Sequence, residues 1–287
     1  MAPAGTDRSR VKAQLASTRA TLARADIPYP WLDAEILLAH VLHSSRERLH
    51  SHPERLLAAS QRARLRRLTS RRAARVPVPY LVGEREFYGH MLKVTPAVLV
   101  PRPSSELLVE LAIDWLTSHA HARRVIDLGT GSGAVAISVA KAVPRVRIEA
   151  RDVSARALRV ADDNIARHRL RRRVTTVRAN LLRGARPADV ILANLPYIPE
   201  ALRRVRPKEL EYEPALALDG GKDGLDLIRI ALAQAPVVVK PGGLVLFECD
   251  PAQTRRIIRL ALLQWPSAEI SVHKDMAGLD RVVRIQT

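Results

Sequence analysis

The first quarter of the chain carries hydrophobic residues at the spacing of helices. Between residues 8 and 75 leucine, isoleucine and valine recur three or four positions apart, and Pro28 and Pro30 separate a first helix from a second. Pro53 is expected to open a further helix, because proline suits the first helical turn. The pattern predicts a small helical bundle without obvious chemistry, whose expected role is to bind or orient a partner.

A linker and a short hairpin are predicted next. Residues 76–79, Val-Pro-Val-Pro, predict an extended segment, since a residue before proline is pushed out of the helical region. Residues 86–94 predict two short strands with a glycine at their turn. A helix is then expected to begin at Glu106, capped by Ser104 or Ser105.

From residue 123 onward, apolar runs alternate with helical stretches. The predicted strands are 125–128, 146–150, 174–177, 190–193, 244–247, 269–273 and 282–285, and the predicted helices are 134–143, 155–167, 225–234 and 251–264. This alternation predicts an α/β fold with a doubly wound, mostly parallel sheet. A short polar stretch through Gly278 joins the last two strands, which predicts an antiparallel C-terminal hairpin at the sheet edge. We therefore expect a helical bundle at 1–75, a linker and hairpin at 76–105, and a sheet domain at 106–287.

The composition is that of a soluble globular protein. The 287 residues are 47% hydrophobic and 26% charged, enough chain for one large domain and one small one. No apolar run approaches the roughly 20 residues that span a bilayer, so no membrane partner is expected. The N-terminal segment lacks a hydrophobic stretch and contains Asp7 and Asp26, which favours a structural helix over a signal or transit peptide.

Cysteine and histidine usage narrows the chemistry. Cys249 is the only cysteine, which excludes intramolecular disulfides and a cysteine-cluster metal site and fits a reducing cytoplasm. It lies in an apolar strand, so we do not expect it to act as a nucleophile. His40 and His43 share a helix face, but no Asp, Glu or Cys completes a ligand set with them, and no metal is expected.

The net charge of +18 is carried almost wholly by arginine. Two explanations stand: a basic surface attracts RNA or an RNA-bound partner such as the ribosome, whereas arginine in place of lysine throughout a chain reflects the nucleotide composition of a genome. The densest cluster is a helical stretch without an acid that contains Arg62, Arg64, Arg66, Arg67, Arg71, Arg72 and Arg75. An RNA contact and a solvated helix face are both consistent with it.

A glycine-rich loop follows the first strand of the sheet domain. Gly129, Gly131 and Gly133 let the backbone approach a ligand closely, and Asp152 follows about twenty residues later, where an acid binds a ribose hydroxyl pair. The alternative for Asp152 is a cap of the helix that starts near Ser154. The loop predicts a nucleotide-containing cofactor.

Two cofactor classes share this layout. A dinucleotide site has the pattern Gly-x-Gly-x-x-Gly/Ala, which Ala134 permits, but no second nucleotide-binding half is visible. A methyltransferase has an acid before the glycines and a polar residue with proline after the fourth strand, and Asp127 and residues 194–197 match this pattern. S-Adenosylmethionine is favoured, because its cationic groups are attracted to Asp127. The alternative for Asp127 is a strand-end turn residue.

Residues 194–197, Asn-Leu-Pro-Tyr, come directly off the fourth strand and are called the acceptor turn below. Pro196 stiffens the turn, so that Asn194 and the carbonyl of Leu195 face the crevice at the carboxyl ends of the strands. Tyr197 adds an aromatic face. Two acceptors and one ring suit a planar amino or amide group whose nitrogen stays free to attack. The alternative is a strand-ending turn whose Asn caps its own backbone and whose Tyr is part of the core.

Seven motifs give the chain a family resemblance. They are DAEILLAHVL at 33–42, PVPYLVGEREFYG at 77–89, VLVPRPSSE at 98–106, DLGTGSGAVAISVA at 127–140, NLPYI at 194–198, EPALALDGGKDGL at 213–225 and AGLDRVV at 277–283. Their order and spacing resemble the HemK/PrmC-type N5-glutamine methyltransferases of peptide chain release factors. The resemblance implies a Rossmann-like methyltransferase domain with S-adenosylmethionine as cofactor, and a bundle that grips a release factor in the cytoplasm.

The resemblance also implies roles for individual residues. The cofactor site would comprise Asp127, Gly129, Thr130, Gly131, Gly133, Asp152, Val153, Asn180, Leu181 and Asn194. Asn194 and the Leu195 carbonyl would hold the side-chain amide of the glutamine in a Gly-Gly-Gln loop. Pro196 would shape the turn and Tyr197 would pack on the amide. Methyl transfer to this nitrogen depends on positioning and needs no metal or covalent intermediate.

Four places depart from the family pattern. The family usually has Pro-Glu-Thr-Glu at 103–106, Asn-Pro-Pro-Tyr at 194–197, Gly-Asp at 179–180 and Glu-x-Gly at 248–250, where this chain has Pro-Ser-Ser-Glu, Asn-Leu-Pro-Tyr, Ala-Asn and Glu-Cys-Asp. Asn-Leu-Pro-Tyr also resembles the site of rRNA adenine dimethylases. Two alternatives therefore stand beside release factor methylation: adenine N6-methylation of rRNA, with the arginine clusters as the RNA grip, and a binding protein that has lost catalysis.

Overall fold

Two compact units make up the chain, and the computed structural model describes residues 9–205 and 207–287. The bundle unit contains the residues up to Gly83 together with Lys208–Tyr212, and the sheet unit contains Glu84–Pro207 and Glu213–Thr287. Val76 and Leu81 are buried in the core of the bundle unit. This unit therefore extends beyond residue 75, because the segment after its last long helix completes its core.

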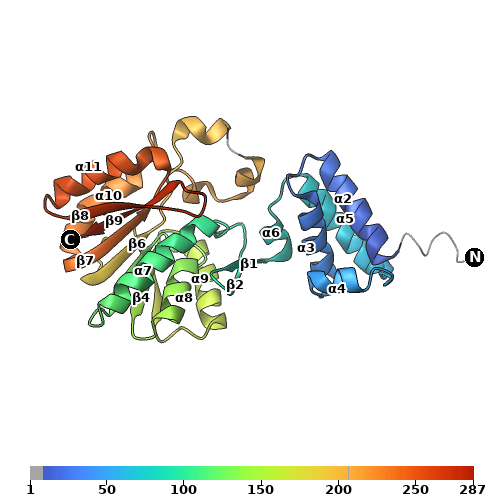
Figure 1. Ribbon diagram of the computed structural model, residues 1–287, viewed down its shortest axis with the longest axis horizontal. Coiled ribbons are helices and arrows are strands. Elements are labelled where there is room, and N and C mark those ends of the chain that lie inside the picture. Colours follow the sequence, from blue (N-terminus) through green and yellow to red (C-terminus); the bar gives the residue numbers. More distant parts are fainter. Residues whose placement is uncertain (1–8, 206) are drawn as a thin grey trace, which may run out of the picture. The chain divides into compact units, whose positions relative to one another are not determined.

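Helices build the bundle unit (Figure 1). They are α2 (Val11–Arg24), α3 (Pro30–Leu42), α4 (Arg46–Ser51), α5 (Ala59–Ala73) and α6 (Val78–Val82). The prediction of an extended linker at 76–79 holds only for 76–77: Pro77 is the N-cap of α6, and Pro79 lies in its first turn, where a fixed φ and a missing N–H are suitable. The prediction that Pro53 opens a helix is wrong, because Pro53 lies in the turn between α4 and α5.

A buried arginine fastens the segment Lys208–Tyr212 to the rest of the bundle unit. The Arg72 guanidinium donates to Asp33 Oδ2 at 2.7 Å and to Glu209 Oε1 at 3.1 Å. The Tyr212 hydroxyl donates to the backbone carbonyl at the C-cap of α5 at 2.6 Å. Arg72 is thus part of a buried ion network and not of the solvated arginine cluster to which its sequence position assigned it.

A seven-stranded sheet forms the centre of the other unit. Its strands are β3 (Arg124–Leu128), β4 (Arg147–Asp152), β5 (Val174–Arg178), β6 (Ala188–Ala193), β7 (Val239–Glu248), β8 (Glu269–Lys274) and β9 (Asp280–Gln286), in the order β5-β4-β3-β6-β7-β9-β8. Neighbours from β5 to β7 are parallel, and β9 is antiparallel to β7 and to β8. The doubly wound, mostly parallel sheet with an antiparallel C-terminal hairpin at its edge is therefore confirmed.

Helices cover both faces of this sheet (Figure 1). The helices α7 (Glu106–Ser118), α8 (Ala134–Ala142) and α9 (Ala155–Arg167) pack on one face, and α10 (Asp226–Gln234) and α11 (Thr254–Gln264) on the other. Along β6, Val190 and Leu192 belong to the first core and Ile191 and Ala193 to the second. Because alternate side chains point to opposite faces, a strand buried on both sides must be apolar throughout, as this one is.

Short elements connect these layers. They are the hairpin β1 (Glu84–Phe87) and β2 (His90–Lys93) and the 3₁₀ turns η1 (Pro103–Ser105), η2 (Glu200–Arg204), η3 (Lys208–Tyr212), η4 (Ala215–Ala217), η5 (Ala235–Val237) and η6 (Pro251–Gln253). Tyr88 and Gly89 both have positive φ, as a two-residue hairpin turn requires, so the predicted hairpin is confirmed. The backbone N–H of Lys93 donates to Asn164 Oδ1 at 2.7 Å, which fixes the hairpin to α9.

Some of the arginine side chains contact the C-terminal ends of helices. The guanidinium groups of Arg145 and Arg173 donate to the carbonyls of Leu116 and Ala140, in the last turns of α7 and α8, where a cation is favourable.

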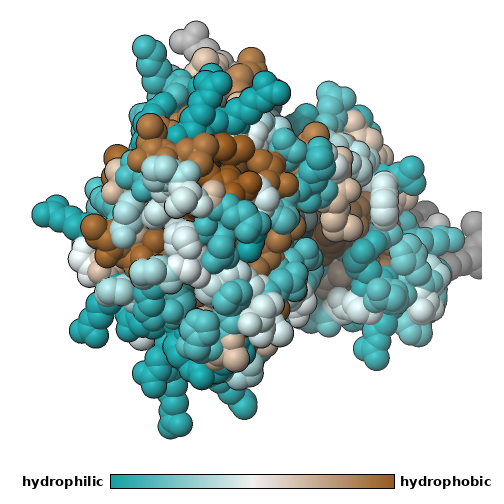
Figure 2. Space-filling view, turned by 60° about the vertical axis from the view of Figure 1, so that its left-hand side comes forward, coloured by the Kyte–Doolittle hydropathy of each residue, from teal (hydrophilic) through white to brown (hydrophobic). Residues whose placement is uncertain are grey.

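Figure 2 shows hydrophilic side chains around the rim of one face and hydrophobic patches between them. Among the helices that the structure describes, none is long and apolar enough to cross a membrane.

Candidate functional site

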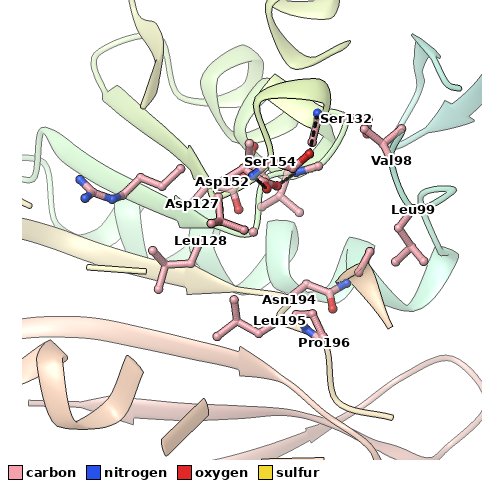
Figure 3. A pocket seen from close by; sticks show the side chains of 18 of the residues that line it. Val98, Leu99, Asp127, Leu128, Ser132, Asp152, Ser154, Asn194, Leu195 and Pro196 are labelled. Atoms are coloured by element: carbon pink, nitrogen blue, oxygen red, sulfur yellow. Dashed lines mark hydrogen bonds between the residues drawn. The ribbon is translucent and has the colours of Figure 1, made fainter. Parts of the chain in front are cut away.

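A cavity of about 350 Å³ lies at the carboxyl ends of β3, β4 and β6 in the sheet unit. The chain turns outward in opposite directions from β3, toward β4 on one side and β6 on the other, and such a switch point is where open α/β sheets bind ligands. Figure 3 shows Asp127 and Asp152 across the pocket from Asn194, Leu195 and Pro196. The volume is in the range of small-molecule and cofactor sites.

The glycine loop forms one wall of the cavity. Gly129 has φ +67°, and a Cβ on it would lie 3.2 Å from the Asn194 carbonyl oxygen and 3.3 Å from Leu195 Cδ2. Gly131 also has positive φ and lines the cavity, and a Cβ on it would meet only the Gly129 carbonyl oxygen, at an ordinary contact distance of 3.8 Å. Gly133 lies behind the loop at the start of α8, where a Cβ would contact Ile137, and it is not part of the cavity wall.

Two carboxylates stand beside the loop. Asp127 is 3% exposed, and burial raises its pKa to about 7, although the Thr130 hydroxyl donates to its Oδ2 at 2.6 Å. Asp152 accepts from the Gly131 N–H at 3.0 Å and from the Ser154 N–H at 2.8 Å. Burial raises the pKa of Asp152 as well, against these hydrogen bonds. Asp152 thus shapes the glycine loop from a position that also opens into the cavity.

Four further predicted residues line the same cavity: Thr130, Val153, Asn180 and Leu181. Asn180 is exposed, so its amide is accessible to a ligand. The backbone of Leu181 has φ +50°, and its carbonyl accepts from Arg151 Nε at 2.8 Å. Arg151 is buried, so this contact anchors the turn that carries Asn180 to β4.

The acceptor turn supplies the opposite wall. Asn194, Leu195 and Pro196 line the cavity, with the Leu195 side chain only 3% exposed against the glycine loop. Asn194 Nδ2 donates to the Ser105 hydroxyl at 2.8 Å. Within the described ranges, neither Asn194 Oδ1 nor the Leu195 carbonyl accepts a hydrogen bond from the protein. The turn therefore offers two acceptors at the cavity.

Tyr197 lies outside the cavity wall. Its carbonyl accepts from Gln253 Nε2 at 2.8 Å, and its hydroxyl lies 3.5 Å from Glu248 Oε1. Gly220 and Gly224 press on its backbone, since a Cβ on Gly224 would lie 2.3 Å from the Tyr197 carbonyl oxygen. The glycine-rich motif at 213–225 thus supports the acceptor turn from behind.

Sequence reasoning missed two polar residues next to the acceptor turn. Ser105 lines the cavity, and Glu248, at the end of β7, is fully buried. The prediction that Ser104 or Ser105 caps α7 is wrong, because the N-cap Ser105 makes no capping hydrogen bond and Ser104 donates to Glu248 Oε1 at 3.2 Å. The local sequence carries a capping signal at this place and no signal for a contact with Asn194.

Neither Cys249 nor a histidine is among the described residues that line this cavity. Cys249 is buried and its pKa is raised to about 12 by burial, so the thiol is a poor nucleophile, as expected. Over residues 9–205 and 207–287 no group of three or more His, Cys, Asp or Glu side chains is arranged to hold a metal ion. His40 Nε2 instead lies 2.8 Å from the Arg64 guanidinium.

Known proteins resemble the chain along most of its length. The model of the PrmC N-terminal domain matches residues 13–83, and that of the methyltransferase small domain matches residues 103–205. A release factor glutamine methyltransferase of Moorella thermoacetica is 39% identical over 262 residues, which cover 91% of this chain and 92% of that protein. One of Bordetella pertussis is 40% identical over 264 residues, with coverages of 90% and 95%.

Solved structures share the fold. The hMettl16 catalytic domain, in complex with MAT2A 3′UTR hairpin 6, aligns with a TM-score of 0.56 at 14% identity and covers 76% of this chain and 81% of that chain. At this identity the likeness extends to the methyltransferase fold alone.

Proposed function

The chain belongs to the family of release factor glutamine methyltransferases, and we propose that it methylates the side-chain nitrogen (N5) of the glutamine in the Gly-Gly-Gln loop of a peptide chain release factor. S-Adenosylmethionine is the proposed methyl donor. The observation that carries the proposal is the contact of Gly129 with the acceptor turn, which brings the two sequence motifs into one cavity.

The residues of the cavity fit S-adenosylmethionine. A nucleoside needs backbone that it can approach closely, which Gly131 offers, and an acid for the ribose hydroxyls, which Asp152 offers. A buried carboxylate, Asp127, suits the cationic amino acid end of the cofactor. When bound, the cofactor supplies a methyl group on a positively charged sulfur as the electrophile.

The acceptor turn performs the protein's part of the reaction. An amide nitrogen is a poor nucleophile because its lone pair is delocalised, so the nitrogen must be held in line with the methyl carbon. Asn194 Oδ1 and the Leu195 carbonyl are free to accept its two N–H groups and to stabilise the positive charge that develops on it. The nitrogen loses one N–H proton to solvent as it gains the methyl group, and a neutral methylamide remains.

A glutamine fits this cavity better than an adenine. A flipped purine is commonly held between aromatic rings. Among the described residues that line the cavity, Phe87 is the only aromatic one, since Tyr197 lies outside the wall. A glutamine side chain needs only the two acceptors, which favours a protein substrate over rRNA.

Two asparagine variants test these assignments. The resemblance also places Asn194 at the cofactor, but its side chain lies across the cavity from Asp127 and Asp152 (Figure 3). Asn194→Ala should therefore lower the turnover number at least about 100-fold with little change in S-adenosylmethionine affinity, because an acceptor-site interaction made in the transition state is lost. Asn180→Ala is the matched control: it makes the same chemical change on the cofactor side and should weaken cofactor binding first. Calorimetry gives the affinity, and mass spectrometry of treated release factor gives the added methyl.

The acceptor itself is tested with a release factor whose Gly-Gly-Gln glutamine is replaced. The native factor should gain one methyl group and the replaced factor none. Methyl groups on rRNA adenine, with the release factor unmodified, would contradict the proposal. Calorimetric binding of S-adenosylmethionine without any transfer would point instead to a binding protein that has lost catalysis.

A further inference from the structure

The serine at the N-cap of α7 does not act as a cap. Ser45 and Ser154 occupy the same position on α4 and α9, and their hydroxyls accept from backbone N–H groups of the first turn at 3.4 and 3.2 Å. Ser105 makes no such bond, because its backbone is helical (φ −73°, ψ −11°) and continues η1 into α7, whereas the backbones of Ser45 and Ser154 are extended. Its hydroxyl accepts from Asn194 Nδ2 instead, across the cavity from the glycine loop. The helical backbone thus leaves this hydroxyl free for a contact with the acceptor turn.

This contact decides which end of the Asn194 amide faces the cavity. The two ends of an asparagine amide have nearly the same shape but opposite hydrogen-bonding character. With Nδ2 bound to Ser105, Oδ1 remains for the substrate. If the amide were rotated by half a turn, Nδ2 would meet the N–H groups of the substrate amide, and two donors would face each other.

A hydroxyl selects an orientation only when its own proton is engaged elsewhere, because a free hydroxyl serves equally as donor and acceptor. Glu248 provides that engagement. Ser104 donates to Oε1 of its buried carboxyl at 3.2 Å, whereas Oε2 has no hydrogen-bond partner among the described residues. The nearby Ser105 and Ser104 both oppose the rise in the pKa of Glu248 that burial causes. The Ser105 hydroxyl accepts from Asn194 Nδ2 at 2.8 Å, which leaves its own proton for the unpartnered Oε2 of Glu248.

We propose that Ser105 is a positioning residue that, together with Glu248, holds the Asn194 amide with Oδ1 toward the acceptor nitrogen. The inference rests on the proposed function, since it takes Asn194 as the residue that holds the substrate amide. It assigns to Ser105 no contact with the reacting atoms. Ser105 lowers the population of the rotated form of the Asn194 amide before the substrate binds.

Three serine variants separate this role from a structural one. Ser105→Ala should lower the turnover number at least about tenfold with the S-adenosylmethionine affinity unchanged within about twofold, because misorientation affects only the acceptor side. Ser105→Thr keeps the hydroxyl and should restore most of the turnover. Ser104→Ala removes a neighbouring hydroxyl that also contacts Glu248 but not Asn194, and it should keep nearly wild-type turnover.

The orientation itself is measurable without activity. In protein with ¹⁵N-labelled asparagine, the side-chain amide signals that Asn194→Ala removes belong to Asn194. Their exchange with solvent should be slow in the wild type and in Ser105→Thr, and several-fold faster in Ser105→Ala. Unchanged exchange and turnover in Ser105→Ala would overturn the role of Ser105. If the wild type fails to methylate release factor, the proposed function fails, and the amide exchange still decides whether Ser105 orients Asn194.

Discussion

Binding of S-adenosylmethionine should weaken as the pH falls, because Asp127 then loses its charge. Burial raises the pKa of this carboxyl to about 7, so it is ionised above that pH and neutral below it. Only the ionised form attracts the cationic end of the cofactor. The sign follows directly: lowering the pH protonates Asp127 and removes the attraction.

The size of the effect follows from the same pKa. If only the ionised form binds, the apparent Kd should rise about tenfold between about pH 8 and about pH 6. At about pH 7 the apparent Kd should already be about twice its value at about pH 8. Calorimetric titration of the free enzyme with S-adenosylmethionine measures it. Asp127→Asn is the control, since the amide keeps the shape but cannot ionise. It should bind more weakly than the wild type at about pH 8 and show a flatter profile.

A Kd in the wild type that stays constant over this range would refute the assignment of Asp127 to the cofactor. An equal slope in Asp127→Asn would transfer the effect to another group, of which Asp152 is the nearest candidate, because burial raises its pKa too. The free energy of unfolding gives an independent check. A carboxyl whose pKa is higher in the folded than in the unfolded chain destabilises the fold above that pKa, so Asp127→Asn without cofactor should be the more stable protein at about pH 8, by up to about 4 kcal/mol.

Two further predictions use matched pairs of variants. Gly129→Ala should lower methyl transfer strongly, since its Cβ would lie 3.2 Å from a carbonyl oxygen of the acceptor turn. Gly89→Ala has a similar positive φ and no atom within 4 Å, so it should lower the unfolding free energy by about 1 kcal/mol and leave kcat unchanged. Chemical denaturation and turnover assays measure the two effects. Arg72→Ala should destabilise the bundle unit by about 3–5 kcal/mol, because it leaves Asp33 buried without its cation, while the exposed neighbour Arg71→Ala should change the unfolding free energy by less than about 0.5 kcal/mol. Equal losses within either pair would contradict the stated cause.

The sequence was sufficient for those parts of the site that depend on strand order. Asp127 lies near the end of one parallel strand, Gly129 and Gly131 follow that strand, and Asn194 follows another. The carboxyl ends of parallel strands lie at one edge of a sheet. Periodicity was enough to predict this arrangement. The pattern was insufficient where local preferences had two outcomes: a Val-Pro repeat suits an extended linker and the first turn of a helix alike, and only burial of Leu81 in the bundle core decides between them.

Contacts between distant residues were beyond sequence reasoning for a different reason. Ser105 is 89 positions away from Asn194 and Ser104 is 144 positions away from Glu248, so no periodicity links either pair. The local signal at 104–105 even pointed to a helix cap, which competes for the same hydroxyl. The 3₁₀ turn η1 extends the helical backbone to Pro103, so Ser105 does not have the extended backbone of a cap and its hydroxyl bonds to a distant residue instead.

The acceptor turn is held from several sides, and this bears on the leucine that stands at its second position. Gly129 lies so close to its first carbonyl that a Cβ would not fit without a shift, Ser105 fixes the Asn194 amide, and Gly224 packs against the backbone of Tyr197. A second proline is therefore not required to stiffen the turn, because its surroundings already restrict it. Leu195 instead fills the space beside the glycine loop with a buried side chain, while its backbone carbonyl stays available to the substrate amide. The departure from Asn-Pro-Pro-Tyr thus changes what packs against the glycine loop and leaves both acceptors of the turn in place.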